Sequence, residues 1–218
     1  MTCIIAVKDG RGGVLMGADS AVTTGDTIQP LVAPKIVRIG DVLIGGAGRL
    51  LHIQRILTRF VPPPQSRKQK DPYVYMVQQF VPALGEARMG GPSTDENGRK
   101  KRQSASTRRV RPTAIAHQHD HHRFDDDDDD DDGFIQMIVA YRGRIFTVSP
   151  DGAVVETAKG YASIGSGAPY AVAALVGLEH AGVIGLSARE RVEIALRTAA
   201  EVSSSVAAPF IYLHSKKK

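Results

Sequence analysis

The chain of 218 residues contains no tryptophan, a single cysteine and only 6% aromatic residues. With so few aromatic rings on which bases could stack, its net charge of +5 does not indicate a nucleic-acid partner. The lone Cys3 excludes an internal disulfide and is typical of a reducing compartment, so we expect a cytoplasmic location. No apolar run approaches the ~18 residues of a membrane span, and no secretory signal opens the chain, so we expect no contact with a membrane.

Short apolar runs bounded by Gly, Asp and Pro alternate with segments of helical periodicity. In order, the pattern predicts strands, two helices, more strands, two helices and a final strand. Such an order is typical of two packed sheets with helices outside. Strands are expected over residues 2–8, 14–18, 35–38, 42–44, 134–141, 145–148, a pair within 154–164, and 209–214; helices are expected over 50–60, 72–88, 170–181 and 188–203.

Some local features refine this pattern. A polar stretch without a predicted element runs to Pro34, and the glycine-rich residues 45–48 are expected to lead from a strand into the first helix. Ser187 and Glu190 have the spacing of a capping box at the start of the last helix. One face of the second helix is expected to hold Val77, Phe80, Val81 and Leu84.

A threonine directly follows the initiator methionine, where the first strand is expected to begin. A threonine hydroxyl is a nucleophile only when a base takes its proton, and an N-terminal threonine carries that base in its own α-amine. The amine is free only after Met1 is removed, and the small size of Thr2 favours this removal. Met-Thr is also a common start for an ordinary strand, so the hypothesis depends on the motifs that follow.

Three segments together resemble the proteasome β-subunit family of N-terminal-nucleophile (Ntn) hydrolases, and within it the bacterial HslV-like branch. They are MTCIIAVKDGRGGVLMGADS, APKIVRIGDVLIGGAG and YASIGSGAPYAVAAL, and the resemblance covers about residues 2–60 and 134–213. It implies an α+β fold, a four-layer αββα sandwich, which agrees with the order of elements predicted above. It also implies a threonine-type endopeptidase that needs no cofactor and no metal.

The resemblance assigns the nucleophile to Thr2, and an aspartate–lysine pair behind it to Asp19 and Lys35. A buried lysine beside Thr2 would lower the proton affinity of its hydroxyl and amine, and its own charge would need Asp19. Taken alone, Asp19 could cap a turn and Lys35 could be a solvated residue at a strand edge.

Four more positions match the family motif. Gly48 corresponds to the glycine whose N–H points into the oxyanion hole, and Ser166 corresponds to a serine near the amine of the nucleophile. Glu201 and Ser204 stand where many members have an Asp-x-x-Ser pattern, and the glutamate departs from it. The glycines of GAG and GSG could also be turn residues, but they complete neither a dinucleotide-binding loop nor a G-x-S-x-G elbow.

The resemblance also implies partners. Identical subunits would form a ring that encloses the sites, an AAA+ ATP-dependent unfoldase would feed it, and a polypeptide would be the substrate. Two alternatives remain open at this stage. One is an Ntn amidohydrolase that acts on small amides, and the other is an inactive structural ring subunit that keeps Met1.

Composition changes abruptly between residues 89 and 133, where eight basic residues, four histidines and eleven acidic residues gather. The remaining twenty basic and twelve acidic residues give the rest of the chain a net charge of about +8. Histidines and aspartates could bind a divalent cation, but the run of eight adjacent aspartates favours a solvated segment without fixed geometry. We therefore expect one Ntn-hydrolase domain over residues 1–218, with residues 90–133 as a disordered insertion in it.

Overall fold

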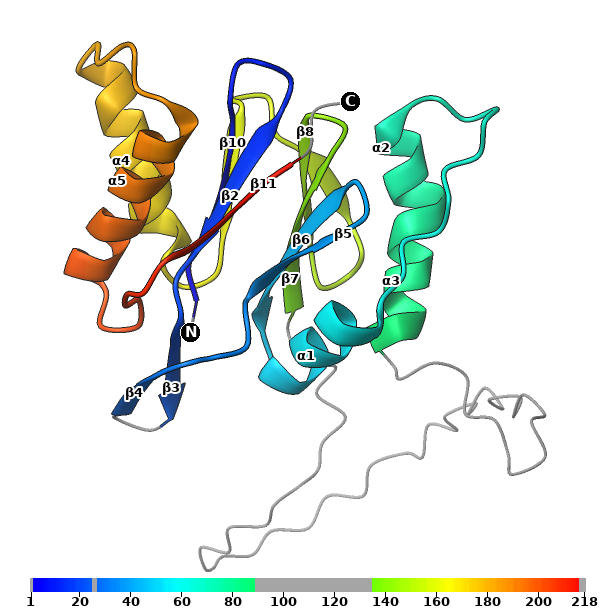
Figure 1. The fold of residues 1–218 in the computed structure, drawn as a ribbon, viewed down its shortest axis with the longest axis horizontal. Helices are drawn as coiled ribbons and strands as arrows, with labels where there is room; N and C mark the ends of the chain where they lie inside the picture. The colour runs from blue at the N-terminus through cyan, green and yellow to red at the C-terminus, as the bar shows by residue number, and fades with distance from the viewer. Residues whose placement is uncertain (1, 25–26, 89–134, 216–218) are drawn as a thin grey trace, which may run out of the picture. The chain divides into compact units, whose positions relative to one another are not determined.

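The computed structural model describes residues 2–24, 27–88 and 135–215. Residues 90–133, predicted to be an insertion, lie outside this part of the chain. A four-stranded antiparallel sheet, in the order β10-β1-β2-β11, contains strands from the beginning and from the end of the sequence (Figure 1). Its strands are β1 (Ile4–Lys8), β2 (Val14–Ala18), β10 (Tyr161–Ile164) and β11 (Ile211–His214).

The continuous apolar run of β1 is explained by burial on both faces. Ile5 and Val7 pack in an apolar cluster with the last two helices of the chain, whereas Ile4 and Ala6 pack in a second cluster with residues of the other main sheet. A strand covered on both sides needs apolar residues at every position rather than at alternate ones. The strand that follows Thr2 is therefore fixed from both faces.

A second, five-stranded antiparallel sheet has the order β5-β6-β7-β8-β9. Its strands are β5 (Ile36–Ile39), β6 (Val42–Gly48), β7 (Ile135–Tyr141), β8 (Arg144–Val148) and β9 (Val154–Glu156). The glycine-rich residues 45–48 belong to β6, so the prediction that the strand ends before them was wrong. A Cβ atom on Gly45 would lie 2.9 Å from Ile36 and 3.1 Å from Ile4, which shows why the strand needs glycine there.

The predicted second helix is present as α2 (Pro72–Tyr75), a π-helical turn η1 (Met76–Phe80) and α3 (Val81–Arg88). Pro82 lacks an N–H and would clash with the carbonyl four residues before it, so a π turn at this point relieves the clash. Met76, Phe80 and Leu84 are buried, whereas Val77 is exposed, so the prediction for Val77 was wrong.

The other helices follow the prediction closely. They are α1 (Leu50–Arg59), α4 (Ala168–His180) and α5 (Ala188–Val202). The predicted capping box is confirmed, since Ser187 accepts from the N–H of Glu190 and the Glu190 side chain accepts from the N–H of Ser187. In the described part of the chain, no helix has both the length and the apolar character needed to cross a membrane.

Two features of the strand pattern differ from the prediction. The predicted pair within residues 154–164 is not a hairpin, because β9 pairs with β8 in the second sheet and β10 pairs with β1 in the first. The polar stretch before Pro34 contains a small separate sheet of β3 (Ala21–Thr24) and β4 (Thr27–Pro30). All residues of β4 are exposed, so no apolar alternation marked it in the sequence.

Three clusters of buried apolar side chains organise these elements. The first joins the second sheet to α1, η1 and α3, the second lies between strands of the two sheets, and the third joins the first sheet to α4 and α5. Figure 1 shows α4 and α5 beside the first sheet, and α1 to α3 beside the second.

Candidate active site

Thr2 lies two residues before the first residue of β1, and only 6% of its surface is exposed. Its backbone is held by the turn between β10 and α4. The Thr2 nitrogen donates to Ser166 Oγ at 3.2 Å, and the Thr2 carbonyl accepts from the Gly167 N–H at 3.0 Å and from Ser166 Oγ at 3.4 Å. This nitrogen is a peptide nitrogen while Met1 is attached, and the same atom becomes the α-amine when Met1 is removed. Met1 itself lies outside the described residues.

Glycines allow the turn to approach Thr2. Gly165 has a φ of +90°, and a Cβ atom on it would collide with the Thr2 carbonyl oxygen. A Cβ atom on Gly167 would lie 2.6 Å from Val206. The N–H of Gly165 donates to the Gln136 side chain of β7, which ties the turn to the second sheet. Both glycines are therefore turn residues and also permit contact with the candidate nucleophile.

Lys35 and Asp19 form a buried ion pair beside the first residues of β1. Lys35 Nζ lies 2.9 Å and 3.0 Å from the two oxygens of Asp19, and their side chains are 6% and 0% exposed. The Asp19 carboxylate also accepts from the N–H groups of Cys3 at 2.8 Å and Ala21 at 3.0 Å. The pairing of β1 with β2 sets Ile4 opposite Ala18, which explains why Asp19 reaches the residue that follows Thr2.

The ion pair brings the two sheets together, because Asp19 follows β2 of the first sheet and Lys35 precedes β5 of the second. Burial lowers the pKa of Lys35 below its ordinary value, while the charge of Asp19 opposes that change. A lysine whose charge is costly, held by a carboxylate, is typical of sites in which proton affinities are tuned.

Cys3, between Thr2 and Ile4, is the other nucleophilic side chain near this point. It is fully buried, and burial together with the negative charge of Asp19 raises its pKa to about 12. The thiol therefore stays protonated near neutral pH, and the reactive thiolate is not available. This leaves the Thr2 hydroxyl as the candidate nucleophile at the start of β1.

A set of serine hydroxyls extends from the turn to the end of α5. Ser166 Oγ lies 3.1 Å from Ser205 Oγ, and Ser205 Oγ lies 2.7 Å from Ser203 Oγ. Ser205 is buried, with 3% of its surface exposed. The sequence prediction named Ser204, one residue away, which the structure places on the surface. Three consecutive serines looked alike in the sequence, and only their burial distinguishes them.

The structure brings together some of the predicted site residues and leaves others apart. Thr2 and Ser166 are in contact, and Asp19 and Lys35 adjoin Cys3. Glu201 is exposed near the end of α5, and no hydrogen bond or ion pair of its side chain with Thr2 or Ser166 is present in the described residues.

Gly48 ends β6 directly before α1 and has a φ of +128°, which only glycine adopts easily. The strand passes close to β1, because Gly45 lies against Ile4 and Ala47 shares an apolar cluster with Ile4. Gly48 is exposed, so its backbone is accessible to a ligand. The role of Gly48 as a backbone donor stays a prediction.

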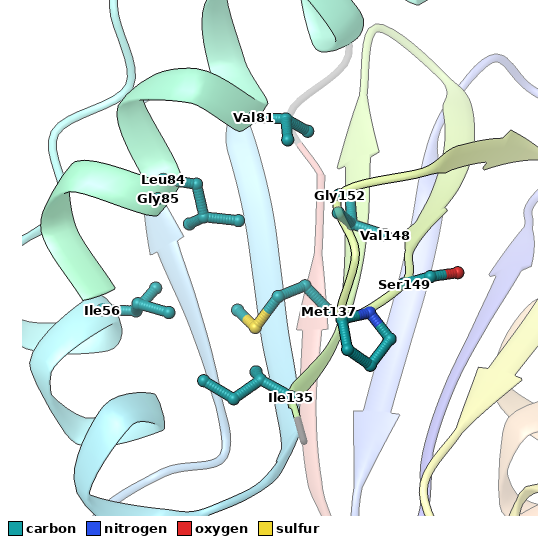
Figure 2. Close-up of a pocket in the computed structure, with 10 residues that line it drawn as sticks. Ile56, Val81, Leu84, Gly85, Ile135, Met137, Val148, Ser149 and Gly152 are labelled. Carbon is teal, nitrogen blue, oxygen red and sulfur yellow. The ribbon is translucent and has the colours of Figure 1, made fainter. Parts of the chain in front are cut away.

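A small hollow of ≈ 70 Å³ lies elsewhere, between α1, α3 and the hairpin of β7 and β8 (Figure 2). Ile56, Leu84 and Met137 point into it, and no titratable side chain lines it. The hollow therefore offers no ionisable acid or base. Within the described residues, no three His, Cys, Asp or Glu side chains gather as a metal ion would need.

No protein-family model matches the chain, and no curated protein matches it. Solved structures match over nearly the whole length. BPH from Thiobacillus denitrificans is 18% identical to this chain, with a TM-score of 0.64, and the match covers 100% of this chain and 99% of that one. The structure of the same protein in complex with epoxomicin is 17% identical, with a TM-score of 0.63, and the match covers 99% of each chain. HslV from Trypanosoma brucei is 21% identical with a TM-score of 0.58, covering 97% of this chain and 98% of that one. The chain therefore has the fold of the proteasome-type Ntn-hydrolase subunits.

Proposed function

We propose that this protein is a threonine-type endopeptidase subunit of a self-compartmentalised, proteasome-like protease, with Thr2 as its nucleophile after removal of Met1. The observation that carries the proposal is the environment of Thr2. Its nitrogen is bound to Ser166 at 3.2 Å, and the buried Lys35–Asp19 pair contacts the next residue of the chain through the Cys3 N–H. An N-terminal threonine, its amine and a buried cation are the groups that such chemistry requires.

In the proposed reaction, the Thr2 amine takes the hydroxyl proton as Oγ attacks the carbonyl carbon of a peptide bond. The negative charge on the carbonyl oxygen is stabilised by backbone N–H donors, among which we place Gly48, and such a donor contributes roughly 3 kcal/mol. Collapse of the intermediate releases the amine product, which takes up the proton, and leaves an ester on Thr2. A water molecule activated by the same amine then hydrolyses the ester.

Lys35, Asp19 and the serines support these steps in the proposal. The positive charge of Lys35 favours the neutral form of the amine, which is the form that can act as a base. Asp19 holds Lys35 and fixes the start of β1 through the Cys3 N–H. Ser166, with Ser205 behind it, holds the Thr2 nitrogen. Glu201 and Ser204 have no part in this proposed arrangement.

We infer that the elements form a four-layer αββα sandwich, a reading supported by the three apolar clusters between helices and sheets. The same proposal places one domain over residues 1–218, with residues 90–133 as an insertion. It also places the protein in the cytoplasm as a ring of identical subunits that encloses the sites and receives polypeptides from an AAA+ unfoldase.

Exposed apolar side chains supply contact surfaces for such a ring. Leu50 and Leu51 are exposed on α1, and Tyr170 is exposed on α4. After α4, Val183 and Ile184 are exposed at 45% and 91%. Large apolar side chains at the surface in such groups mark interaction sites in soluble proteins. Light scattering at micromolar concentration tests this part, and a fully active monomer of 23.4 kDa would contradict the ring and favour the amidohydrolase alternative.

The nucleophile is tested by comparing Thr2→Ala and Thr2→Ser with the wild type on fluorogenic peptides. Thr2→Ala should abolish hydrolysis while the fold and assembly persist, because only the hydroxyl and methyl groups are lost, and Thr2→Ser should keep part of the activity. Thr58→Ala is a matched control, since Thr58 is exposed on α1 and bonds only to backbone carbonyls of its own helix. An active Thr2→Ala variant would overturn the mechanism.

Covalent labelling gives a second, independent test. BPH from Thiobacillus denitrificans was solved in complex with epoxomicin. We expect the same compound to modify Thr2 here, as detected by mass spectrometry of the N-terminal peptide. Thiol-directed reagents should not inhibit native protein, because the Cys3 thiol is buried with a pKa of about 12. Intact mass also separates the alternatives, since a purely structural subunit would retain Met1.

A further inference from the structure

One residue of β7, Gln136, is polar and only half-buried, whereas the other six residues of the strand are buried. Side chains alternate along a strand, so Gln136 shares its face with Ile138 and Ala140, which pack in the same apolar cluster as Ile4 of β1. Gln136 therefore stands on the face of β7 that is turned toward the first sheet. A polar side chain in such a place is costly unless it is bonded.

The Gln136 side chain is bonded to the turn that contacts Thr2. Its Oε1 accepts from the Gly165 N–H at 3.3 Å. The direction of this bond is fixed, because a backbone N–H can only donate. Gly165 lies against the Thr2 carbonyl oxygen, with which an added Cβ atom would collide, and the Gly167 N–H donates to the same oxygen at 3.0 Å. Gln136 thus holds the turn at a residue that packs against Thr2.

Gln136 also adjoins the end of β6, where Gly48 is the proposed backbone donor. In the antiparallel register, Gln136 is opposite Ala47, and Ile135 is opposite Gly48. Residues that are directly opposite in such a pair share a face of the sheet, with Cβ atoms ~5 Å apart. The turn at Gly165 follows β10 of the first sheet, whereas Gly48 ends β6 of the second. One side chain therefore connects that turn with the strand end that carries Gly48.

We propose that Gln136 is a positioning residue that fixes the distance between the hydroxyl of Thr2 and the backbone donor at Gly48. The inference rests on the proposed function, in which Thr2 Oγ attacks a carbonyl group while Gly48 stabilises the carbonyl oxygen. Two such groups must be held within about 0.5 Å of the productive geometry, and here they come from different sheets. A bond from the second sheet to the turn beside Thr2 supplies this constraint.

The test compares Gln136→Met and Gln136→Asn with the wild type on a fluorogenic peptide, after intact mass has shown that Met1 is removed. Methionine has a similar length but no amide oxygen. Asparagine keeps the amide, but its shorter side chain does not bring the oxygen to the Gly165 N–H. In both variants we expect kcat to fall about two- to tenfold, in line with one hydrogen bond. KM should be unchanged, because the lost constraint acts in the transition state rather than on peptide binding.

Thr147→Val is the matched control. Thr147 is half-buried in β8, opposite Ile138, so it stands on the same face of the sheet as Gln136, but β7 separates it from β6. Its kcat and KM should equal those of the wild type. All rates are measured well below the melting temperatures, so that a loss of stability alone leaves kcat unchanged. Wild-type kcat in either Gln136 variant, a rise in KM in place of the fall in kcat, or an equal fall in Thr147→Val would overturn the inference.

The inference and the proposed function fail in different ways. If the wild type with Met1 removed hydrolyses no peptide, the proposed function fails. The hold of Gln136 on the turn is then tested on the same proteins by amide hydrogen exchange with mass spectrometry. A fragment that contains residues 165–167 should exchange about two- to tenfold faster in Gln136→Met than in Thr147→Val, because one hydrogen bond of the turn is lost. Equal exchange in the two variants would reject the inference.

Discussion

The two main sheets differ in what they bury. The second sheet packs against α1 to α3 through an apolar cluster rich in aromatic rings, including Phe60, Tyr75 and Phe80. Five buried polar residues gather near the start of β1: Thr2, Asp19, Ser20 and Ser205, with Lys35 from the side of the second sheet. A sixth, Ser215, lies at the other end of the first sheet, where its hydroxyl accepts from the N–H of Val14. Because buried polar groups are costly unless they are bonded, the cluster at the start of β1 supports the proposed site. The second sheet contributes mainly apolar packing.

The ion pairs of the two sheets should differ most in how much each contributes to the free energy of unfolding. Asp19→Ala removes the carboxylate that faces the buried charge of Lys35, so the free energy of unfolding should fall by about 3–5 kcal/mol. In the second sheet, Arg144 and Glu156 form a partly exposed pair between β8 and β9, and Glu156→Ala should cost at most about 1 kcal/mol. Urea denaturation measures both values. The double variant Asp19→Ala/Lys35→Met should recover most of the loss, and no recovery would contradict the role of the buried charge.

Removal of the lysine charge should affect catalysis as well as stability. Lys35→Met keeps the apolar stem and removes the charge, so we expect kcat to fall at least ~100-fold, as for loss of a major electrostatic contribution. Arg38→Met, on the exposed side of β5 only three residues away, is the control and should retain full activity. Peptide hydrolysis by the purified variants decides the matter. Equal activity of both variants would remove Lys35 from the mechanism.

Alanine substitutions at two glycines near the first sheet compare a position where a side chain would clash with a position where it would not. Gly167→Ala would place a Cβ atom 2.6 Å from Val206 and 2.7 Å from Cys3, so it should destabilise the protein by about 1–3 kcal/mol and slow peptide hydrolysis. Gly177→Ala, within α4, meets nothing within 4 Å and should stabilise the protein by about 0.5–1 kcal/mol. Melting temperatures should therefore move in opposite directions. A shift of the same sign would show that the approach of the turn to Thr2 is not tight.

The smallest effect is expected from residues 90–133, which belong to neither sheet and lie outside the described residues. Their composition offers almost no apolar surface to bury, so replacement by a short Gly/Ser linker should leave the melting temperature nearly unchanged. Calorimetry of the shortened chain measures this. Loss of soluble protein, or micromolar metal affinity that maps to residues 117–132, would give the segment a structural or binding role.

The sequence allowed most helices and strands to be predicted, because these depend on local patterns. Continuous apolar runs located β1 and β7, and the Ser187 capping box located the start of α5. The Thr2, Asp19 and Lys35 positions came from the resemblance, and the structure shows Asp19 and Lys35 paired, while their catalytic roles stay predictions.

The features that were missed depend on distant contacts. The strand character of Gly45 comes from side chains of Ile36 and Ile4 that no local pattern reveals. The π turn before Pro82 and the exposure of Val77 within it were not predicted, because they depend on how the helix packs against the second sheet. Ser205 could not be told from Ser204, since the choice depends on which hydroxyl faces Ser166, 39 residues away.

The sequence positions of the segments that contact β1 and Thr2 determine when Thr2 becomes buried during synthesis. β2 follows within a few residues, but β10 and Ser166 lie about 160 residues further along the chain. At a translation rate of about 5–20 residues per second, roughly 8–30 s pass before these partners of Thr2 leave the ribosome. Throughout that interval the first residues are paired on one side only, and an aminopeptidase has access to Met1. Processing of the N-terminus would thus precede burial of Thr2, so a nascent chain would complete its site only after the initiator residue is gone.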